Sequence, residues 1–151
     1  MARLSIASFI GPICVFESEG SIVAVRRMDV PDGDGTPVLR EARDQLEAYF
    51  RDELRTFDLP LAPAGSGFQQ RVYREMQAIE HGRTRTYGEI AEAVGCSAQA
   101  VGQACGSNPI PIIIPCHRVL AANGLGGFSG WGGVETKAAL LRHERAYSLL
   151  L

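Results

Sequence analysis

The chain opens with a pattern that is typical of short strands. Residues 4–10, 13–17 and 21–27 are rich in apolar and β-branched side chains, and Gly11-Pro12 and residues 18–20 separate them. Apolar runs of this length between turn residues indicate strands connected by tight turns. The sequence therefore predicts a meander of three antiparallel strands.

A helical pattern follows the predicted sheet. From Pro37 to about residue 55, apolar residues recur every three or four positions, with charged residues between them. This spacing places the apolar side chains on one face of a helix. They are Leu39, Ala42, Leu46, Tyr49, Phe50 and Leu54. Residues 59–65, with two prolines and a final glycine, predict a linker, so we expect one domain over residues 1–64 and a second over residues 65–151.

The second domain is predicted to be mainly helical. Ser66, Thr86 and Ser97 each precede a stretch with helical apolar spacing, and their side chains can accept hydrogen bonds from the free amides at a helix start. A helix is therefore expected after each of them. Gly95 separates the last two, which gives a helix-turn-helix pattern.

Residues 108–115 fit neither pattern. Their prolines prevent a helix, yet their isoleucines are too apolar to lie in water, so we expect a buried irregular segment. Glycines around Trp131 predict a loop, and a last helix is expected over residues 134–145. The predicted fold class is α/β of the α+β kind, with a small antiparallel sheet first and a helical domain second.

Composition narrows the class of protein. The chain has 151 residues, of which 46% are hydrophobic and 21% charged, and these fractions exclude disordered, collagen-like and coiled-coil chains. The longest apolar run, residues 110–116, is far shorter than the roughly 20 residues of a membrane span. With no credible signal-peptidase site near the N-terminus, we expect a cytoplasmic protein.

Charge is distributed unevenly along the chain. The net charge is −2, with 7 basic and 11 acidic residues in positions 1–65 but 8 basic and 6 acidic residues in positions 66–151. The overall acidity argues against tight non-specific binding to nucleic acid. Arg83 and Arg85, in a polar loop, are candidate phosphate contacts.

The four cysteines, Cys14, Cys96, Cys105 and Cys116, form no CxxC pair. We expect free thiols, no disulfide framework and no metal site. Cys116 is the candidate for a reactive thiol, because it follows the apolar segment directly and precedes His117, a group that can stabilise a thiolate. On these residues alone, an inert buried cysteine remains an open alternative.

Residues 108–119, with the sequence NPIPIIIPCHRV, resemble the signature of the O6-alkylguanine-DNA alkyltransferases. The resemblance extends upstream to Phe68-Gln69 and the segment 87–91, and downstream to residues 127–130 and to His143-Glu144. It implies a ribonuclease-H-like N-terminal domain and a C-terminal catalytic domain of the winged helix-turn-helix kind. The function it implies is DNA repair by a monomer without cofactor, which moves the alkyl group from O6 of guanine irreversibly to its own cysteine. Acceptance of O4-alkylthymine stays open.

The resemblance also assigns roles to catalytic residues. Cys116 would be the nucleophile, and His117 would take its proton through a water molecule. Glu144 would orient the imidazole and stabilise its charge. Tyr87 would donate a hydrogen bond to N3 of the departing guanine. The residues assigned to the substrate pocket are Asn108, Pro111, Val119, Phe128 and Ser129.

DNA contacts follow from the same resemblance. The target nucleotide would rotate out of the duplex, with the second helix of the pair in the minor groove and the small residues Ala98 and Gly102 allowing close approach. Gln99 occupies the position where the family usually has an arginine that fills the gap left by the base. Arg118 is predicted as a further DNA contact. We expect this protein to extrude the target nucleotide from duplex DNA less effectively than a protein with that arginine.

Three other functions are weighed against this one. An alkyltransferase-like protein would bind the lesion without repair, but such proteins replace the reactive cysteine, and Cys116 is present. A cysteine hydrolase would need an oxyanion hole, for which the sequence has no signal. A transcriptional activator of this family would need a separate domain with clustered cysteines. The alkyltransferase interpretation is the one that the sequence favours.

Overall fold

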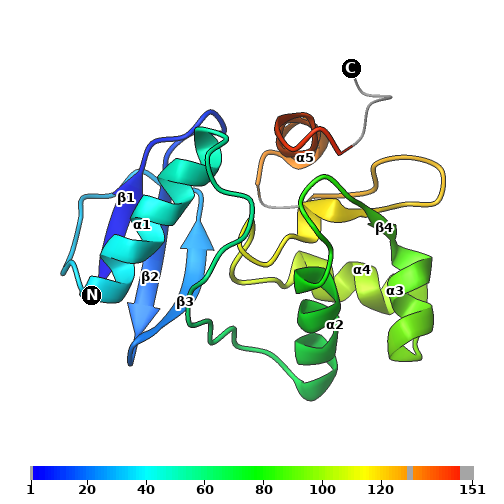
Figure 1. The fold of residues 1–151 in the computed structure, drawn as a ribbon. Helices are drawn as coiled ribbons and strands as arrows, with labels where there is room; N and C mark the ends of the chain where they lie inside the picture. Colours follow the sequence, from blue (N-terminus) through cyan, green and yellow to red (C-terminus); the bar gives the residue numbers. More distant parts are fainter. Residues whose placement is uncertain (1, 129–130, 147–151) are drawn as a thin grey trace. The chain divides into compact units, whose positions relative to one another are not determined.

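The structure is a computed structural model that describes residues 2–128 and 131–146. The chain forms two compact units: Met1–Ala64 with Pro109–Pro111, and Gly65–Asn108 with Ile112–Leu151. Figure 1 shows a sheet with one helix in the first unit and a set of helices in the second. Within the described ranges, no helix has the length and apolarity needed to cross a membrane.

The sheet of the first unit is the predicted meander. It consists of β1 (Arg3–Ile6), β2 (Ile13–Ser18) and β3 (Ser21–Arg26), antiparallel and in the order β1-β2-β3. The first strand ends at Ile6, four residues earlier than predicted. The reason is a turn in which the Gly11 amide donates to the Ser8 carbonyl at 3.1 Å and the Ser8 hydroxyl donates to the Gly11 carbonyl at 2.6 Å.

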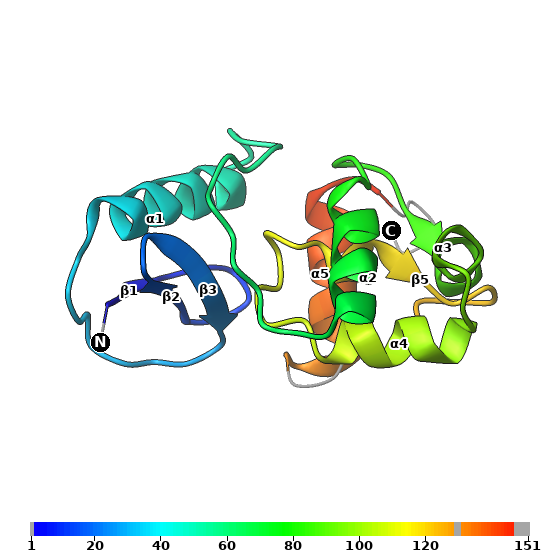
Figure 2. The ribbon, with the colours of Figure 1, turned by 90° about the horizontal axis from the view of Figure 1, so that it is seen from below.

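One helix, α1 (Pro37–Phe50), contacts all three strands and covers one face of the sheet (Figure 2). The Thr36 hydroxyl caps its first turn by accepting from the Leu39 amide at 3.2 Å. The prediction of a helix to residue 55 is wrong at its end. Asp52 has a left-handed φ of 62°, a conformation that a helix cannot continue through.

The outer edge of β3 is covered by other parts of the chain. The Ile22 amide donates to the Pro60 carbonyl at 2.8 Å, and the Val25 amide donates to the Pro109 carbonyl at 2.9 Å. These bonds satisfy backbone groups that an edge strand would otherwise leave open. They also explain why Pro109–Pro111 belong to the first unit.

The second unit contains the predicted helix-turn-helix. Its first three helices are α2 (Gly67–Gln77), α3 (Tyr87–Val94) and α4 (Ala98–Gly106). The Ser66, Thr86 and Ser97 side chains accept hydrogen bonds at the starts of these helices, as predicted. Gly95 ends α3 with a left-handed φ of 82°, which glycine adopts without steric cost. The mixed fold class expected from the sequence is therefore confirmed.

A short parallel pairing in the second unit was not predicted. The strands β4 (Arg85–Thr86) and β5 (Val119–Leu120) have two residues each, and Arg85 pairs with Val119. This pairing joins the start of α3 to the chain that follows Cys116. Two residues are too few for an alternating pattern, so the sequence has no local signal for it.

The segment between α4 and Cys116 is buried and irregular, as expected. Ile112 has a φ of 73°, a left-handed conformation that is a strained outlier for a β-branched residue. The 3-10 turn η1 (Cys116–Arg118) follows directly. The last helix, α5, spans Gly133–His143 and so ends two residues before the predicted end, with Glu144 as its C-terminal cap.

Candidate active site

Cys116 lies at the start of η1, and its side chain is only 6% exposed. The Cys116 amide donates to the Ile114 carbonyl at 2.8 Å, and the Asn108 side-chain amide donates to the same carbonyl, also at 2.8 Å. Burial raises the pKa of the Cys116 thiol, although the Asn108 side chain and the charge of Lys137 act in the opposite direction. The resting thiol is therefore protonated and needs a base.

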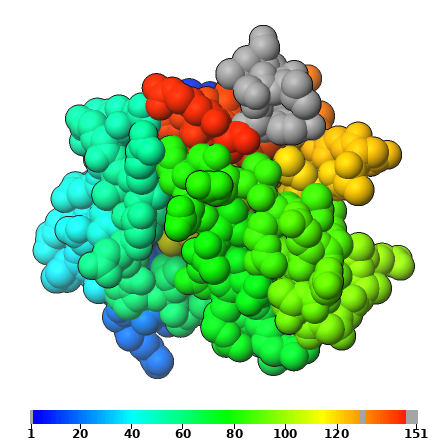
Figure 3. Space-filling view, turned by 45° about the vertical axis from the view of Figure 1, so that its right-hand side comes forward, coloured from blue at the N-terminus to red at the C-terminus, as the bar shows by residue number. Residues whose placement is uncertain are grey.

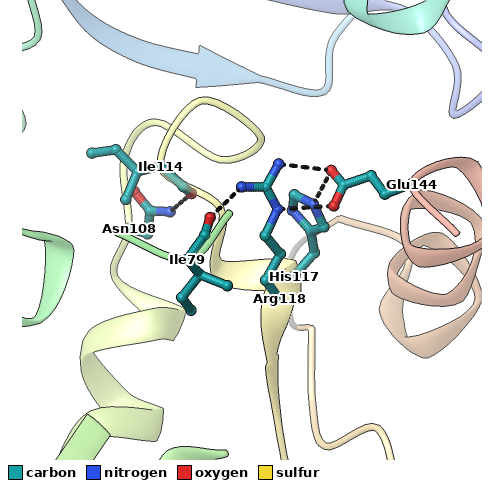
Figure 4. Close-up of polar contacts among 6 residues, drawn as sticks. All are labelled: Ile79, Asn108, Ile114, His117, Arg118 and Glu144. Carbon is teal, nitrogen blue, oxygen red and sulfur yellow. Dashed lines mark hydrogen bonds and ion pairs between the residues drawn. The ribbon is translucent and has the colours of Figure 1, made fainter. Parts of the chain in front are cut away.

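His117 directly follows Cys116 in the chain and is fully buried. Its Nε2 is 2.7 Å from Oε2 of Glu144, a carboxylate that is 2% exposed (Figure 4). Among the described residues, His117 Nδ1 has no hydrogen-bond partner. Because an ionised carboxylate only accepts hydrogen bonds, Nε2 carries the proton and the Nδ1 lone pair of a neutral ring is available as a base.

The electrostatics of the pair follow from its burial. Burial lowers the pKa of His117, against the raising effect of Glu144. Burial alone would raise the pKa of Glu144, but its hydrogen bonds to His117 and Arg118 outweigh this and hold that pKa well below its ordinary value. Glu144 is therefore ionised at neutral pH, and His117 is neutral.

Arg118 does not lie where a DNA contact requires it, and that prediction is corrected here. Its side chain is buried, and Nε and Nη2 donate to Oε1 and Oε2 of Glu144 at 2.8 and 3.1 Å. Nη1 donates to the Ile79 carbonyl at 2.6 Å. With these bonds made inside the protein, the guanidinium is not offered to a phosphate.

Tyr87 and Lys137 form a second polar group beside Cys116. Lys137 is fully buried, and its Nζ donates to the Val119 carbonyl at 2.6 Å, the Gly127 carbonyl at 3.2 Å and the Tyr87 hydroxyl at 3.4 Å. Burial lowers the pKa of Lys137 to about 8 and raises that of Tyr87 to about 12. Tyr87 is thus a hydrogen-bond donor at every pH at which the protein works.

The Tyr87 ring is also held in place by a glycine. A Cβ at Gly126 would lie 2.8 Å from Tyr87 Cε2 and 2.9 Å from its hydroxyl oxygen, and Gly126 has a φ of +76°. Both facts require glycine at this position. Gly126 could not be singled out from the sequence, because a glycine-rich loop gives no sign of which glycine is in close contact.

The other predicted pocket residues are distributed over both units. Val119 begins β5, and Phe128 is buried with 9% exposure. Pro111 belongs to the first unit, whereas Cys116 belongs to the second. Ser129 lies outside the described residues. The structure thus gathers the catalytic candidates in the second unit, but it leaves the pocket assignment a prediction.

The helix α4 presents the residues expected at DNA. Ala98 and Gln99 are exposed, and a Cβ at Gly102 would meet no atom within 4 Å. Packing within the protein therefore gives no reason for Gly102, although glycine in a helix interior costs about 1 kcal/mol relative to alanine. Figure 3 shows the lime-green residues of α3 at the molecular surface.

Lys137 is a site residue to which the sequence alone assigned no role. A signal was present, because Lys137 and Glu144 share a helical stripe with Leu140 and Leu141, both fully buried. Charged residues on the apolar face of a helix are unusual and point to paired or functional groups.

Among residues 2–128 and 131–146, no three His, Cys, Asp or Glu side chains are arranged to hold a metal ion.

Comparisons with known proteins identify the family of the chain. The family model described as 6-O-methylguanine DNA methyltransferase, DNA binding domain, matches residues 67–146. The model described as 6-O-methylguanine DNA methyltransferase, ribonuclease-like domain, matches residues 1–63. The chain thus contains both domains of that family.

Individual relatives give the same result. A methylated-DNA–protein-cysteine methyltransferase of Methanosarcina acetivorans is 44% identical over 146 residues, which cover 89% of this chain and 92% of the relative. The constitutive enzyme of the same name from Bacillus subtilis is 47% identical over 113 residues, covering 73% of this chain and 68% of the relative. A crystal structure of Mycobacterium tuberculosis OGT in complex with DNA has a TM-score of 0.84 and 42% identity, with 95% of this chain and 92% of that chain covered. On this evidence, the chain belongs to the 6-O-methylguanine DNA methyltransferase family.

Proposed function

We propose that this protein repairs alkylated DNA by moving the alkyl group from O6 of guanine to Sγ of its own Cys116. The observation that carries the proposal is the 2.7 Å hydrogen bond between His117 Nε2 and Glu144. It fixes a neutral imidazole whose Nδ1, unpartnered among the described residues, is free to act as a base. This base is on His117, the residue directly after Cys116 in the chain.

The reaction is a displacement at the alkyl carbon. A bond forms between Sγ and this carbon while the bond from carbon to O6 breaks, and the electron pair of that bond passes to the guanine. The thiol proton goes to His117 Nδ1, through a water molecule as the family resemblance implies. The departing guanine anion takes up a proton from water at N1, and the imidazolium returns the thiol proton to water, so the protons balance. Because a thioether is not a leaving group for water, the transfer occurs once and is irreversible.

Tyr87 and Lys137 act on the leaving group. As guanine departs it gains negative charge, which a hydroxyl donor at N3 stabilises. The hydrogen bond from Lys137 Nζ to the Tyr87 oxygen makes this hydroxyl a better donor. We assign Tyr87 as a catalytic residue and Lys137 as a residue that positions and polarises it.

The proposed substrate pocket contains the remaining residues named from the resemblance. The carbonyls of Cys116 and Val119 would accept from the exocyclic amine of guanine, and the Val119 oxygen has a second lone pair beside its bond to Lys137. Asn108 would hold the turn before Cys116. Pro111, Phe128 and the backbone amide of Ser129 would complete the pocket.

DNA is the partner, and we propose that α4 enters the minor groove after the target nucleotide has rotated out. The open space above Gly102 supports close approach of a backbone or sugar. Gln99 would hydrogen-bond the orphaned base. We further propose that the protein acts as a monomer in the cytoplasm, a reducing compartment that fits its four free cysteines.

A mass measurement tests the function. The protein is mixed with an oligonucleotide containing O6-methylguanine, as a single strand and as a duplex, and fragmentation of its peptides locates any added methyl group. We expect one methyl on Cys116 and none on the Cys116→Ser variant. Lesion binding with no methyl transfer would contradict the proposal and identify an alkyltransferase-like sensor, whereas repeated turnover would indicate a hydrolase.

A further inference from the structure

Arg118 makes three hydrogen bonds inside the second unit, and two of them go to Glu144. The guanidinium Nε and Nη2 lie 2.8 and 3.1 Å from the two carboxylate oxygens, and Nη1 lies 2.6 Å from the Ile79 carbonyl (Figure 4). Arg118 is 5% exposed and Glu144 is 2% exposed. The pair is therefore a two-point ion pair with almost no solvent screening.

Glu144 thus has two possible sources of positive charge. His117 can supply it only when protonated, whereas arginine is charged at every accessible pH. A buried carboxylate without a counter-ion is costly. If His117 were its only partner, the imidazole would be drawn into the protonated form, which has no lone pair for a thiol proton.

We propose that Arg118 is a positioning residue that serves as the permanent counter-ion of Glu144, so that His117 rests as a neutral ring with its proton on Nε2 and a lone pair on Nδ1. The bond from Arg118 to Ile79 anchors this charge to the chain just beyond α2, so the carboxylate is held in one orientation. The effect on methyl transfer rests on the function proposed above. The protonation state of His117 at rest is independent of that function.

The charges around His117 agree with this assignment. Glu144, at the end of α5, raises the pKa of His117, and burial, Arg118 on η1 and Lys137 on α5 lower it. The Cys116 thiol is neutral at rest because burial raises its pKa. During transfer the imidazolium forms as the Cys116 thiol gives up its proton, with Glu144 already in place to stabilise it.

Nitrogen NMR of the histidine side chains tests the proposal. In the full-length protein labelled with nitrogen-15, a His117→Gln variant identifies the His117 signals. We expect the wild type to show the neutral ring with a proton on Nε2 at pH 7. In Arg118→Met we expect an imidazolium at pH 7 and a titration midpoint raised by at least about one pH unit. Arg142→Met, which removes an exposed arginine near the same end of α5, should match the wild type.

Methyl transfer provides a second readout. Arg118→Met should slow transfer to Cys116 about 100-fold at pH 7, the usual effect of losing a general base, while Arg118→Lys should keep His117 neutral and retain more of the rate. An imidazolium in the wild type at pH 7 would overturn the proposal, even if Arg118→Met does not fold. An unchanged His117 titration in a folded Arg118→Met would also overturn it. If the wild type transfers no methyl group, the proposed function fails but the NMR result still decides the role of Arg118.

Discussion

Lys137 Nζ donates a 2.6 Å hydrogen bond to the backbone carbonyl of Val119. The same ammonium group also donates to Gly127 and to the Tyr87 hydroxyl. One buried side chain therefore links α5 to β5, to the glycine-rich loop and to the start of α3. Lys137 and Tyr87 also interact electrostatically with Cys116, so a change at Lys137 should affect both stability and transfer.

The burial of Lys137 should make the stability of the protein depend on pH. Its pKa falls from 10.5 to about 8, so between these two pH values the unfolded chain binds more protons than the folded one. The Lys137 contribution to the free energy of unfolding therefore rises with pH across this window. A methionine side chain at this position does not titrate, so its contribution to the free energy of unfolding does not depend on pH in this way.

We therefore expect the stability of Lys137→Met relative to the wild type to fall as pH rises from 8 to 10. The difference should change by up to about 1.4 kcal/mol per pH unit. Urea unfolding of both proteins at pH 7, 8, 9 and 10 measures it. A difference that does not depend on pH would show that Lys137 keeps an ordinary pKa in the folded protein.

Tyr87→Phe should slow methyl transfer about 100-fold, the usual effect of removing one donor to a developing negative charge. The measurement is a single-turnover rate with an oligonucleotide containing O6-methylguanine. Because burial raises the pKa of Tyr87 to about 12 and lowers that of Lys137 to about 8, the ratio of the two rates should be largest below pH 8 and should shrink above it, as Lys137 loses the proton that polarises the Tyr87 hydroxyl. Tyr73→Phe is the matched control: the Tyr73 hydroxyl is buried, and nothing in residues 2–128 and 131–146 hydrogen-bonds it. Equal losses in both variants would contradict the role of Tyr87.

Gly126→Ala should displace the Tyr87 ring. The added methyl group would lie within 3 Å of two Tyr87 atoms, at a backbone φ of +76°, and we expect the free energy of unfolding to fall by about 1–3 kcal/mol. Transfer should slow as well. Gly124→Ala, where a Cβ would meet nothing within 4 Å, should change stability by less than about 0.5 kcal/mol. Similar effects in both variants would mean that the loop responds to any side chain.

Glu144→Gln should destabilise the protein strongly, because it leaves the buried Arg118 without its counter-ion. The expected loss is about 3–5 kcal/mol at pH 7, measured by urea unfolding. Since the pKa of Glu144 is lowered in the folded state, its stabilising effect is present above about pH 4.5 and is lost as pH falls. The difference between variant and wild type should therefore shrink in acid. Glu135→Gln, on the exposed face of α5, should have little effect at either pH, and a constant difference for Glu144→Gln would count against the ion pair.

The elements that the sequence predicted well are those with a local physical cause. Ser66, Thr86 and Ser97 cap the helices that follow them, and a cap needs only residues three positions apart. Helix ends were less predictable, since Asp52 adopts a left-handed conformation that its residue type does not require. The β4-β5 pairing joins residues far apart in the chain, so no local pattern could indicate it.

The functional site also contains residues that a local motif indicates and contacts that no local motif indicates. The resemblance identified Cys116 and His117 as candidates from adjacent letters of a motif. The partner of Arg118 could not be read in this way, because Glu144 lies 26 positions away and a motif does not show which way a side chain points. An arginine in a family that binds DNA therefore suggested a phosphate contact, and only its burial corrects this.

The exposed residues of α4 lead to the last prediction. The helices α3 and α4 contain Glu89 and Glu92 but no lysine or arginine, and Gln99 occupies the position where the family usually has arginine. A longer, charged side chain there should hold the duplex open better after the nucleotide has rotated out. Gln99→Arg should therefore raise the transfer rate on duplex DNA and leave the rate on single strands nearly unchanged.

Gln103→Arg is the control that separates gap filling from simple charge attraction. Gln103 is exposed on α4, one turn after Gln99, so this variant adds the same charge without a side chain at the position of the missing base. An added positive charge strengthens binding to any phosphate backbone, and salt weakens this effect. If both variants raise the duplex rate equally, and the gain disappears at high salt, the residue at 99 only attracts DNA. A gain confined to Gln99→Arg that persists in salt would show that this position limits how well the protein opens a duplex.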